Sequence, residues 1–223
     1  MAKYGDIRVV GTSHIAKESV EKVKKAINSY KPDFIALELD KQRLSSLLSK
    51  KKKFSLKILK EFGIKALFLN LIGSFIEKRL SKKTGILPGT EMKTAIKLAK
   101  EQKIKITLID QPVNITLKKL TSRITRKEKF RFLKDILSSL FLRKKQLSFD
   151  LNKVPSEEVV KKLIEDTKEK YPTVYQVLIE ERNKFMAKAL YKLTHLYPKK
   201  KILAIVGAGH EEGIIGELKS IKN

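Results

Sequence analysis

The chain has 223 residues, enough to bury a substantial core as one large domain or two small ones. Hydrophobic residues make up 42% of it, so the protein is globular rather than disordered. It has no cysteine, which excludes disulfides, cysteine-ligated zinc and thiol nucleophiles, and its formal net charge of +26 favours polyanionic partners such as nucleic acid, anionic lipid or acidic protein.

The composition also bears on where the protein works. The Lys-, Ile- and Leu-rich sequence, with 33% charged residues, is typical of thermophile proteins. No signal peptide precedes the first expected strand, and no run of about 18 uncharged apolar residues occurs, so we expect no transmembrane segment in this chain. The sequence therefore predicts a cytoplasmic protein or one held peripherally at a membrane.

The first expected elements form a β–α–β unit. The apolar run 7–10 predicts a short strand, and apolar residues at helical spacing predict a helix over 15–30. A second buried strand over 34–37 ends in Glu38 and Asp40. The two strands are expected to be parallel, with a right-handed crossover.

The middle of the chain predicts more helix and a third strand. Residues 41–81 are amphipathic and helical in spacing, and a helix is expected over 91–102. The strand predicted over 104–109 ends at Asp110, because Pro112 cannot donate to a strand ladder.

The remaining elements complete an α/β fold. Basic and apolar residues alternate at helical spacing over 115–147, and helices are expected from 156 to the break at 171–173 and from there to about 197. A last strand over 202–206 and a closing helix over 213–221 follow. We predict one α/β domain over 1–223, with a parallel or mixed central sheet flanked by helices and long helical insertions at about 41–83 and 115–172.

Two of the three histidines follow a strand in the same setting. Residues 11–14 read Gly-Thr-Ser-His and residues 207–210 read Gly-Ala-Gly-His, each directly after an apolar run. If both strands belong to one parallel sheet, His14 and His210 emerge at the same edge, where α/β proteins build their sites. The alternative for each histidine alone is a helix cap or a hydrogen-bonded core residue.

Carboxylates follow the other two strands. Glu38, Asp40 and Asp110 would then share the edge that carries both imidazoles. Imidazole and carboxylate ligands suit Zn, Mn, Co or Fe, and the sequence does not choose among them. Such a metal activates water or polarises a carbonyl. Asp40 has the alternative role of capping the helix that carries Arg43, and Asp110 that of forming the turn before Pro112.

A charged group interrupts the last long helix. Arg182 and Asn183 lie between otherwise regular apolar positions. Arg182 could stabilise an oxyanion or clamp a substrate carboxylate, and the alternative is a solvated face or ion-pair network. His195, in the last turn of that helix, is interpreted as structural.

Motifs spread over nearly the whole chain resemble those of TraB/PrgY-type proteins. In chain order they are residues 11–20, 31–33, 38–43, 89–92, 95, 109–112, 115–117, 181–183, 186–187 and 206–214. The family includes proteins linked to shutdown of peptide pheromone signalling. It is similar to the Tiki metal-dependent proteases and, more distantly, to erythromycin esterase-like folds.

The resemblance implies an α/β fold with both Gly-x-x-His motifs in one site. It implies His14, Glu38 and His210 as metal-binding or catalytic positions, supported by Glu91, Arg182 and Asn183. Two features depart from the family. Gln111 stands where the family often has an arginine. Many microbial members also carry a hydrophobic membrane domain after the soluble part, whereas we expect no transmembrane segment in this chain.

Three hypotheses follow. The first is a metal-dependent hydrolase acting on peptides. In it His14, His210 and Glu38 hold the metal, Asp110 or Glu91 moves protons, Arg182 and Asn183 support catalysis, and Arg43 and Ser13 contact the substrate. The second is a non-catalytic protein that sequesters a peptide in the same pocket.

The third hypothesis places the function in the basic helices. They would dock on anionic membrane, with nucleic acid less favoured, because apolar side chains interleave the charges as in interfacial helices; these are Phe130, Phe132, Phe141 and Leu142. The same pattern also fits the contact face of a homo-oligomer.

Overall fold

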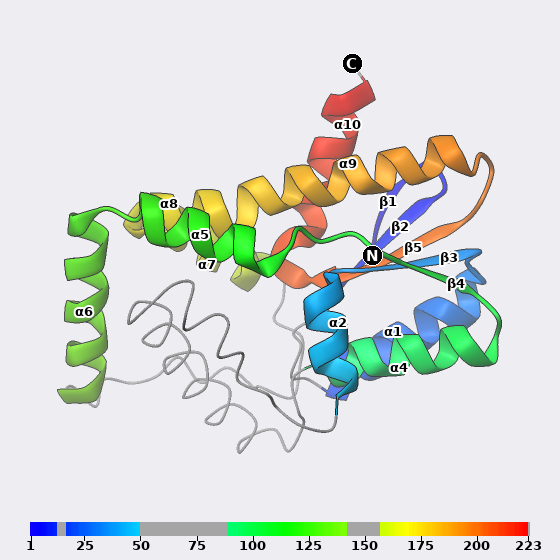
Figure 1. The fold of residues 1–223 in the computed structure, drawn as a ribbon, viewed down its shortest axis with the longest axis horizontal. Coiled ribbons are helices and arrows are strands. Elements are labelled where there is room, and N and C mark those ends of the chain that lie inside the picture. The colour runs from blue at the N-terminus through cyan, green and yellow to red at the C-terminus, as the bar shows by residue number, and fades with distance from the viewer. Residues whose placement is uncertain (13–16, 50–88, 142–156, 223) are drawn as a thin grey trace.

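The computed structural model describes residues 1–12, 17–49, 89–141 and 157–222, and its centre is a five-stranded mixed sheet (Figure 1). The strand order is β1-β2-β5-β3-β4. Only β1 is antiparallel to its neighbour, whereas β2, β5, β3 and β4 are parallel. The strands are β1 (Ala2–Tyr4), β2 (Ile7–Thr12), β3 (Phe34–Leu37), β4 (Lys105–Leu108) and β5 (Ile202–Gly207). The predicted α/β class and its four parallel strands are confirmed.

The strands that precede the two Gly-x-x-His motifs are direct neighbours. Thr12 pairs with Gly207 in the parallel register of β2 and β5. A Cβ atom on Gly11 would lie 2.4 Å from Oε2 of Glu211 and 2.9 Å from Cα of Ala208, so this close approach requires glycine. Segments nearly two hundred positions apart therefore leave the sheet side by side.

Helices cover both faces of the sheet (Figure 1). α1 (Lys17–Tyr30) and α4 (Thr90–Glu101) pack on one face, where Val23, Ile27 and Ile96 meet β3 and β5. α9 (Glu181–Leu196) and α10 (Glu211–Lys222) pack on the other, through Met186, Leu190 and Ile214. Burial on both faces explains why β3 and β5 are continuous apolar runs.

Shorter elements surround this core. They are α2 (Lys41–Leu48), α5 (Val113–Arg123), α6 (Arg126–Phe141), α7 (Glu157–Lys170), α8 (Pro172–Tyr175), the π-helical segment η1 (Gln176–Glu180) and the 3-10 turn η2 (Ala208–His210). Within the described ranges, no helix is long and apolar enough to cross a membrane. Most of the helix expected over 41–81 lies outside the described residues.

Two sequence predictions differ from the structure. β1 was not expected, because three residues that pair through a tight turn at Gly5 (φ 53°) are too few to show a strand pattern. In the described part of the run predicted to be helical over 115–147 there are two helices, α5 and α6, separated at Ile124 and Thr125. A capping box stops the first and starts the second. The hydroxyl of Thr125 accepts from Glu128 N (3.1 Å), and Oε2 of Glu128 accepts from Thr125 N (2.9 Å).

We expect Glu128→Gln to weaken the junction of α6 and α8 by about 1–2 kcal/mol at neutral pH, because hydrogen bonds to a charged acceptor are the stronger ones. Oε1 of Glu128 also accepts from Thr173 N (2.8 Å). Burial raises the pKa of Glu128, but the hydrogen bonds from Thr125 and Thr173 outweigh it and lower the pKa below its usual value.

The sign of the pH dependence follows. Stabilisation by Glu128 is fully present above the ordinary glutamate pKa and is lost as the pH falls through the lowered, folded-state pKa. Urea unfolding of the wild type and Glu128→Gln from pH 7 to pH 3 should therefore show two curves that converge in acid. The exposed Glu101→Gln is the control, and a constant gap between the curves would contradict this account.

Candidate functional site

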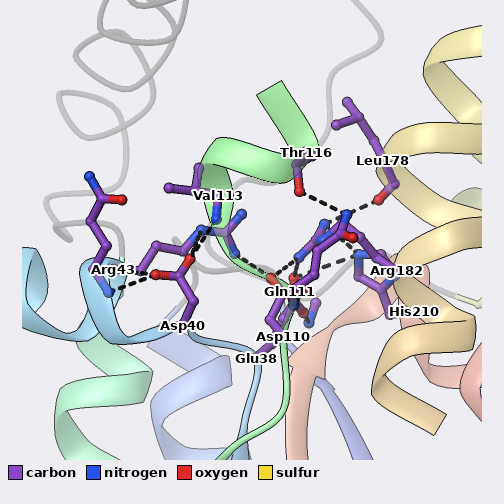
Figure 2. Close-up of polar contacts among 12 residues, drawn as sticks. Glu38, Asp40, Arg43, Asp110, Gln111, Val113, Thr116, Leu178, Arg182 and His210 are labelled. Carbon is purple, nitrogen blue, oxygen red and sulfur yellow. Dashed lines mark hydrogen bonds and ion pairs between the residues drawn. The ribbon is translucent and has the colours of Figure 1, made fainter. Parts of the chain in front are cut away.

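A buried ionic cluster occupies the carboxyl edge of the parallel strands (Figure 2). Glu38 follows β3, Asp110 follows β4, His210 ends η2 after β5, and α9 supplies Arg182 and Asn183. We call these five residues the Arg182 cluster. All five are buried, with 4–8% of each residue exposed. The polar residues predicted at the ends of three neighbouring strands thus do meet at one edge.

Arg182 is the centre of the cluster. Its Nε donates to Oδ1 of Asp110 (3.1 Å), and its Nη2 donates to Oδ2 of Asp110 (2.8 Å) and to Oε1 of Glu38. Its Nη1 donates to the carbonyl of Leu178 (3.1 Å) and contacts Nε2 of His210 (2.9 Å). A guanidinium has five N–H groups, and these five contacts use all of them. In this arrangement Arg182 has no donor left for a substrate oxyanion or carboxylate.

The electrostatics keep Arg182 charged. Burial alone would lower the pKa of Arg182, but hydrogen bonds to Asp110 and the charges of Glu38 and Asp110 raise it above its usual value. Among the described residues, no buried side-chain nitrogen or oxygen lacks a hydrogen-bond partner. The cluster is therefore a fully paired ionic network, of the kind that tolerates burial.

The contacts of His210 define its tautomer. Arginine only donates, so Nε2 of His210 accepts the hydrogen bond from Nη1 of Arg182. Nδ1 then carries the proton and donates to Oδ1 of Asn183 (2.6 Å). Nε2 also lies 3.6 Å from Oε1 of Glu38. A neutral imidazole is thus held with its single available lone pair directed at Arg182 and beside Glu38.

Glu38 joins the ends of two strands. Its Oε2 accepts from the backbone N–H of Gly207 (2.5 Å), at the end of β5, while Oε1 accepts from Arg182. β3 ends at Leu37, so Glu38 and Asp40 lie beyond the strand. Their side chains therefore need not follow the alternation between the two faces of the sheet that strand residues show. Asp40 instead caps α2, accepting from the N–H groups of Gln42 (2.7 Å) and Arg43 (3.0 Å). The capping alternative for Asp40 is confirmed.

Asp110 is shared by two arginines. In addition to Arg182, it accepts from Nη1 of Arg43 at 2.5 Å, and its own turn supplies the N–H of Gln111 (2.8 Å). Gln111, which stands where the family often has arginine, is buried and donates to the hydroxyl of Thr116 (2.8 Å). Asp110 therefore fixes the position of both guanidiniums. Arg43, predicted to contact substrate, is about one-third exposed at its side chain and pairs with Asp110 and Asp40.

A π-helical segment places Arg182 and Asn183. η1 directly precedes α9, and its Leu178 carbonyl accepts from Arg182. Such segments are rare and often mark functional sites. The sequence showed only that charged residues interrupt the apolar spacing near 180–183. Glu181 has the ion-pair role considered for this stretch, because it binds Lys119 and Arg123 of α5, each at 2.5 Å.

We expect Gly213→Ala to disturb the site although alanine favours helix. A Cβ atom on Gly213 would lie 2.1 Å from Nδ2 of Asn183, so that side chain would have to move and loosen its hydrogen bond to His210. The expected cost is about 1–3 kcal/mol. Gly216→Ala, in the same helix, meets nothing within 4 Å and should stabilise by about 0.4–1 kcal/mol. Thermal unfolding of both variants measures the difference, and equal effects would contradict the packing of Asn183 on Gly213.

A cavity of about 660 Å³ lies beside the cluster. Asn183 and Gly209 line it, so it reaches the residues that hold His210. Its wall is mixed, with apolar, basic and acidic side chains; these include Ile164, Ile179, Tyr175, Lys161, Lys168 and Glu165. Its size falls within the range of ligand pockets.

The other predicted residues are placed as follows. Glu91 is buried in the first turn of α4, and its carboxylate is not among the groups that contact Arg182. His14 and Ser13 lie outside the described residues. His195 is exposed and binds the carbonyl of Tyr191 through Nδ1 (2.9 Å), which agrees with a structural role.

Glu38 and His210 are two donors of the types that bind divalent metals in proteins. Two ligands of one metal lie about 3–4 Å apart when each bond is about 2.0–2.2 Å, and Nε2 of His210 is 3.6 Å from Oε1 of Glu38. Within residues 1–12, 17–49, 89–141 and 157–222, no three His, Asp or Glu side chains are grouped to hold a metal. The third predicted ligand, His14, is outside those ranges, so Glu38 and His210 are two members of the predicted set.

Comparison with known proteins gives a consistent result. Residues 3–223 match the TraB/PrgY/gumN family. An uncharacterized protein of Methanocaldococcus jannaschii is 40% identical over 98% of this chain, which spans 54% of that protein's length. TraB domain-containing proteins of Bos taurus and Homo sapiens are each 22% identical over 93% of this chain, which spans 61% of their length.

One solved structure is also similar. It is titled "Cofacial heme binding to ChaN of Campylobacter jejuni", and it is 14% identical, covering 98% of this chain and 77% of that one with a TM-score of 0.41. This likeness is too distant to bear on any ligand of the present chain.

Proposed function

Because the chain belongs to the TraB/PrgY/gumN family, we propose that it is a metal-dependent hydrolase of peptides whose centre is the Arg182 cluster. The observation that carries the proposal is the 3.6 Å spacing of Nε2 of His210 and Oε1 of Glu38 at the carboxyl edge of the sheet. The chain spans 54% of the length of the Methanocaldococcus jannaschii relative and 61% of that of the Bos taurus relative.

Each residue of the site has a distinct role in this proposal. His210, Glu38 and His14 would hold a divalent ion such as Mn, Co, Zn or Fe, which when bound supplies a Lewis acid and an activated water. Asn183 fixes the His210 tautomer by accepting from Nδ1 (2.6 Å), as partners of metal-binding histidines do. Asp110 orients Arg182 and Arg43.

The cavity beside Asn183 is the proposed substrate site. Its 660 Å³ would accommodate a few residues of peptide, and its apolar and charged walls match the mixed chemistry of a peptide chain. Gly209 and Gly213, the latter in the first turn of α10, also line this cavity.

The chain's three histidines provide the test. The purified protein should bind Mn²⁺ and cleave members of a defined peptide mixture, with cleavage detected by mass spectrometry and abolished by a chelator. His14→Ala and His210→Ala should lose both properties. His195→Ala is the matched control and should keep both, because His195 is exposed and its hydrogen bonds are with Thr194 and Tyr191 of its own helix.

The outcomes separate the hypotheses. Mn²⁺ binding that is unchanged in His14→Ala and His210→Ala would remove the metal assignment. Peptide binding without cleavage, whichever of the four metals is added, would replace the hydrolase with a peptide-sequestering protein that uses the same cavity.

A second function is favoured by the surface of α6. Phe130 is 73% exposed and lies among exposed basic residues of α6, including Arg126, Lys127 and Lys129. An exposed aromatic ring amid positive charge is typical of helices that bind the surface of anionic membranes. We infer that this helix can hold the protein at such a surface, in addition to the chemistry at the Arg182 cluster.

We expect Phe130→Ala and Lys127→Ala to weaken binding to vesicles that contain anionic lipid, each in a different way. Loss of Lys127 should reduce the salt dependence of binding, and loss of Phe130 should reduce affinity at every salt concentration. Co-sedimentation with neutral and anionic vesicles measures both. Binding that ignores salt, or equal binding to a duplex DNA of the same charge density, would oppose a membrane-specific role.

A further inference from the structure

The guanidinium of Arg182 already fills the place between the two described metal donors. Nη1 lies 2.9 Å from Nε2 of His210, and Nη2 contacts Oε1 of Glu38. The two atoms that would bind the metal, Nε2 of His210 and Oε1 of Glu38, are 3.6 Å apart. A cation is therefore present at this position without any metal, and it is part of the chain.

The two cations exclude each other at His210. The imidazole Nε2 has one lone pair, and a lone pair that accepts from Arg182 cannot bind a metal at the same time. Nδ1 cannot substitute, because its proton is donated to Asn183 at 2.6 Å. Binding of a metal through His210 therefore requires the hydrogen bond from Arg182 to break.

Arg182 would keep several hydrogen-bond partners if it moved away from His210 and Glu38. Its Nε and Nη2 form a two-pronged contact with Asp110, at 3.1 and 2.8 Å, and Arg43 holds Asp110 in place from the other side. The carbonyl of Leu178 in η1 accepts a further hydrogen bond. A small rotation about Asp110 would release His210 and Glu38 while leaving the guanidinium paired.

From this geometry we propose that Arg182 is an internal competitor of the metal: the site has an arginine-occupied state and a metal-occupied state, and displacement of Arg182 limits metal affinity. This inference rests on the proposed metal-dependent function. In the metal-free state Arg182 neutralises Glu38 and keeps the cluster folded. It is thus a positioning residue that acts through His210 and Glu38.

The test compares Mn²⁺ binding, by calorimetry, in the wild type, Arg182→Met, Arg182→Lys and Arg43→Met, each also made with His210→Ala to identify the binding that needs His210. Arg182→Met should bind Mn²⁺ at least about tenfold more tightly than the wild type, equivalent to about 1.4 kcal/mol. Arg43→Met is the matched control: it also removes a guanidinium from Asp110 but contacts neither Glu38 nor His210, so its affinity should stay within about threefold. Arg182→Lys keeps a positive charge and should lie between wild type and Arg182→Met.

Thermal unfolding gives a readout independent of hydrolysis. Saturating Mn²⁺ should raise the melting temperature of Arg182→Met by more than it raises that of the wild type, since the ion restores the missing charge. If Arg182→Met does not fold without metal, folding that depends on Mn²⁺ supports the inference, and Arg182→Lys still reports affinity.

The failures are distinguishable. Wild-type binding that needs His210, together with equal or weaker binding in Arg182→Met and Arg182→Lys, overturns the competition and leaves the proposed function standing. Absence of His210-dependent Mn²⁺ binding in every form overturns the proposed function and the competition together.

Discussion

Replacing Arg182 with methionine is expected to lower the free energy of unfolding by about 3–5 kcal/mol in metal-free buffer. The residue is 8% exposed and pairs with two buried carboxylates, Glu38 and Asp110. Methionine fills part of the volume but supplies no charge, so two buried anions would lose their shared partner. The loss of an ion from such a network costs more than the network contributes, because the remaining charges stay desolvated.

Urea unfolding in the presence of a chelator measures this effect. Arg123→Met is the control, since Arg123 pairs with Glu181 through a side chain that is 47% exposed, and exposed pairs contribute about 0–1 kcal/mol. An Arg182→Met protein that loses less than about 1 kcal/mol would mean that water reaches Glu38 and Asp110. The cluster would then not be the buried network described above.

Replacing Glu38 with glutamine is expected to weaken Mn²⁺ binding by about a hundredfold or more and to abolish peptide cleavage. The substitution keeps the shape and removes the charge. It also creates a conflict between donors, because one oxygen of Glu38 accepts from Gly207 N and the other from Arg182. An amide has one acceptor oxygen, so in either orientation its NH₂ group faces another N–H.

Calorimetry with Mn²⁺ and the peptide assay measure the two effects, and circular dichroism shows whether the variant is folded. We also expect a loss of about 1–3 kcal/mol in stability from the unmade hydrogen bond. Glu21→Gln, on the exposed face of α1, should behave as the wild type. A folded Glu38→Gln protein with unchanged Mn²⁺ affinity would remove Glu38 from the ligand set and leave the metal site to the histidines and residues beyond the described ranges.

Much of the fold could be predicted because the spacing of apolar residues along the chain reflects which faces of a strand or helix are buried. The apolar runs at 34–37 and 202–206 are strands buried on both faces, and α1 and α4 carry their buried apolar residues on one side. Breaks were harder to predict. The capping box at Thr125 and Glu128 was present in the sequence as Thr-x-x-Glu, but the continuous amphipathic pattern around it concealed the end of α5.

Part of the candidate site could likewise be predicted from the sequence, and part could not. Residues at strand ends could be identified one by one, and Glu38, Asp110 and His210 do converge. The function of Arg182 could not be derived from the sequence, because its contacts join it to Asp110 and Glu38, which are 72 and 144 positions away along the chain. No local pattern records such distances. Nor could the sequence show that Gly213 makes room for Asn183.

The amino-acid sequence by itself determined the α/β class, the four strands that are parallel in the sheet, the family and the polar residues that follow those strands, because each depends on local composition, period or motif. The tertiary structure alone decided that a guanidinium lies between His210 and Glu38, with every N–H used. Packing decides this, since the π-helical segment before α9 sets where Arg182 points and the ends of β3, β4 and β5 set what it meets.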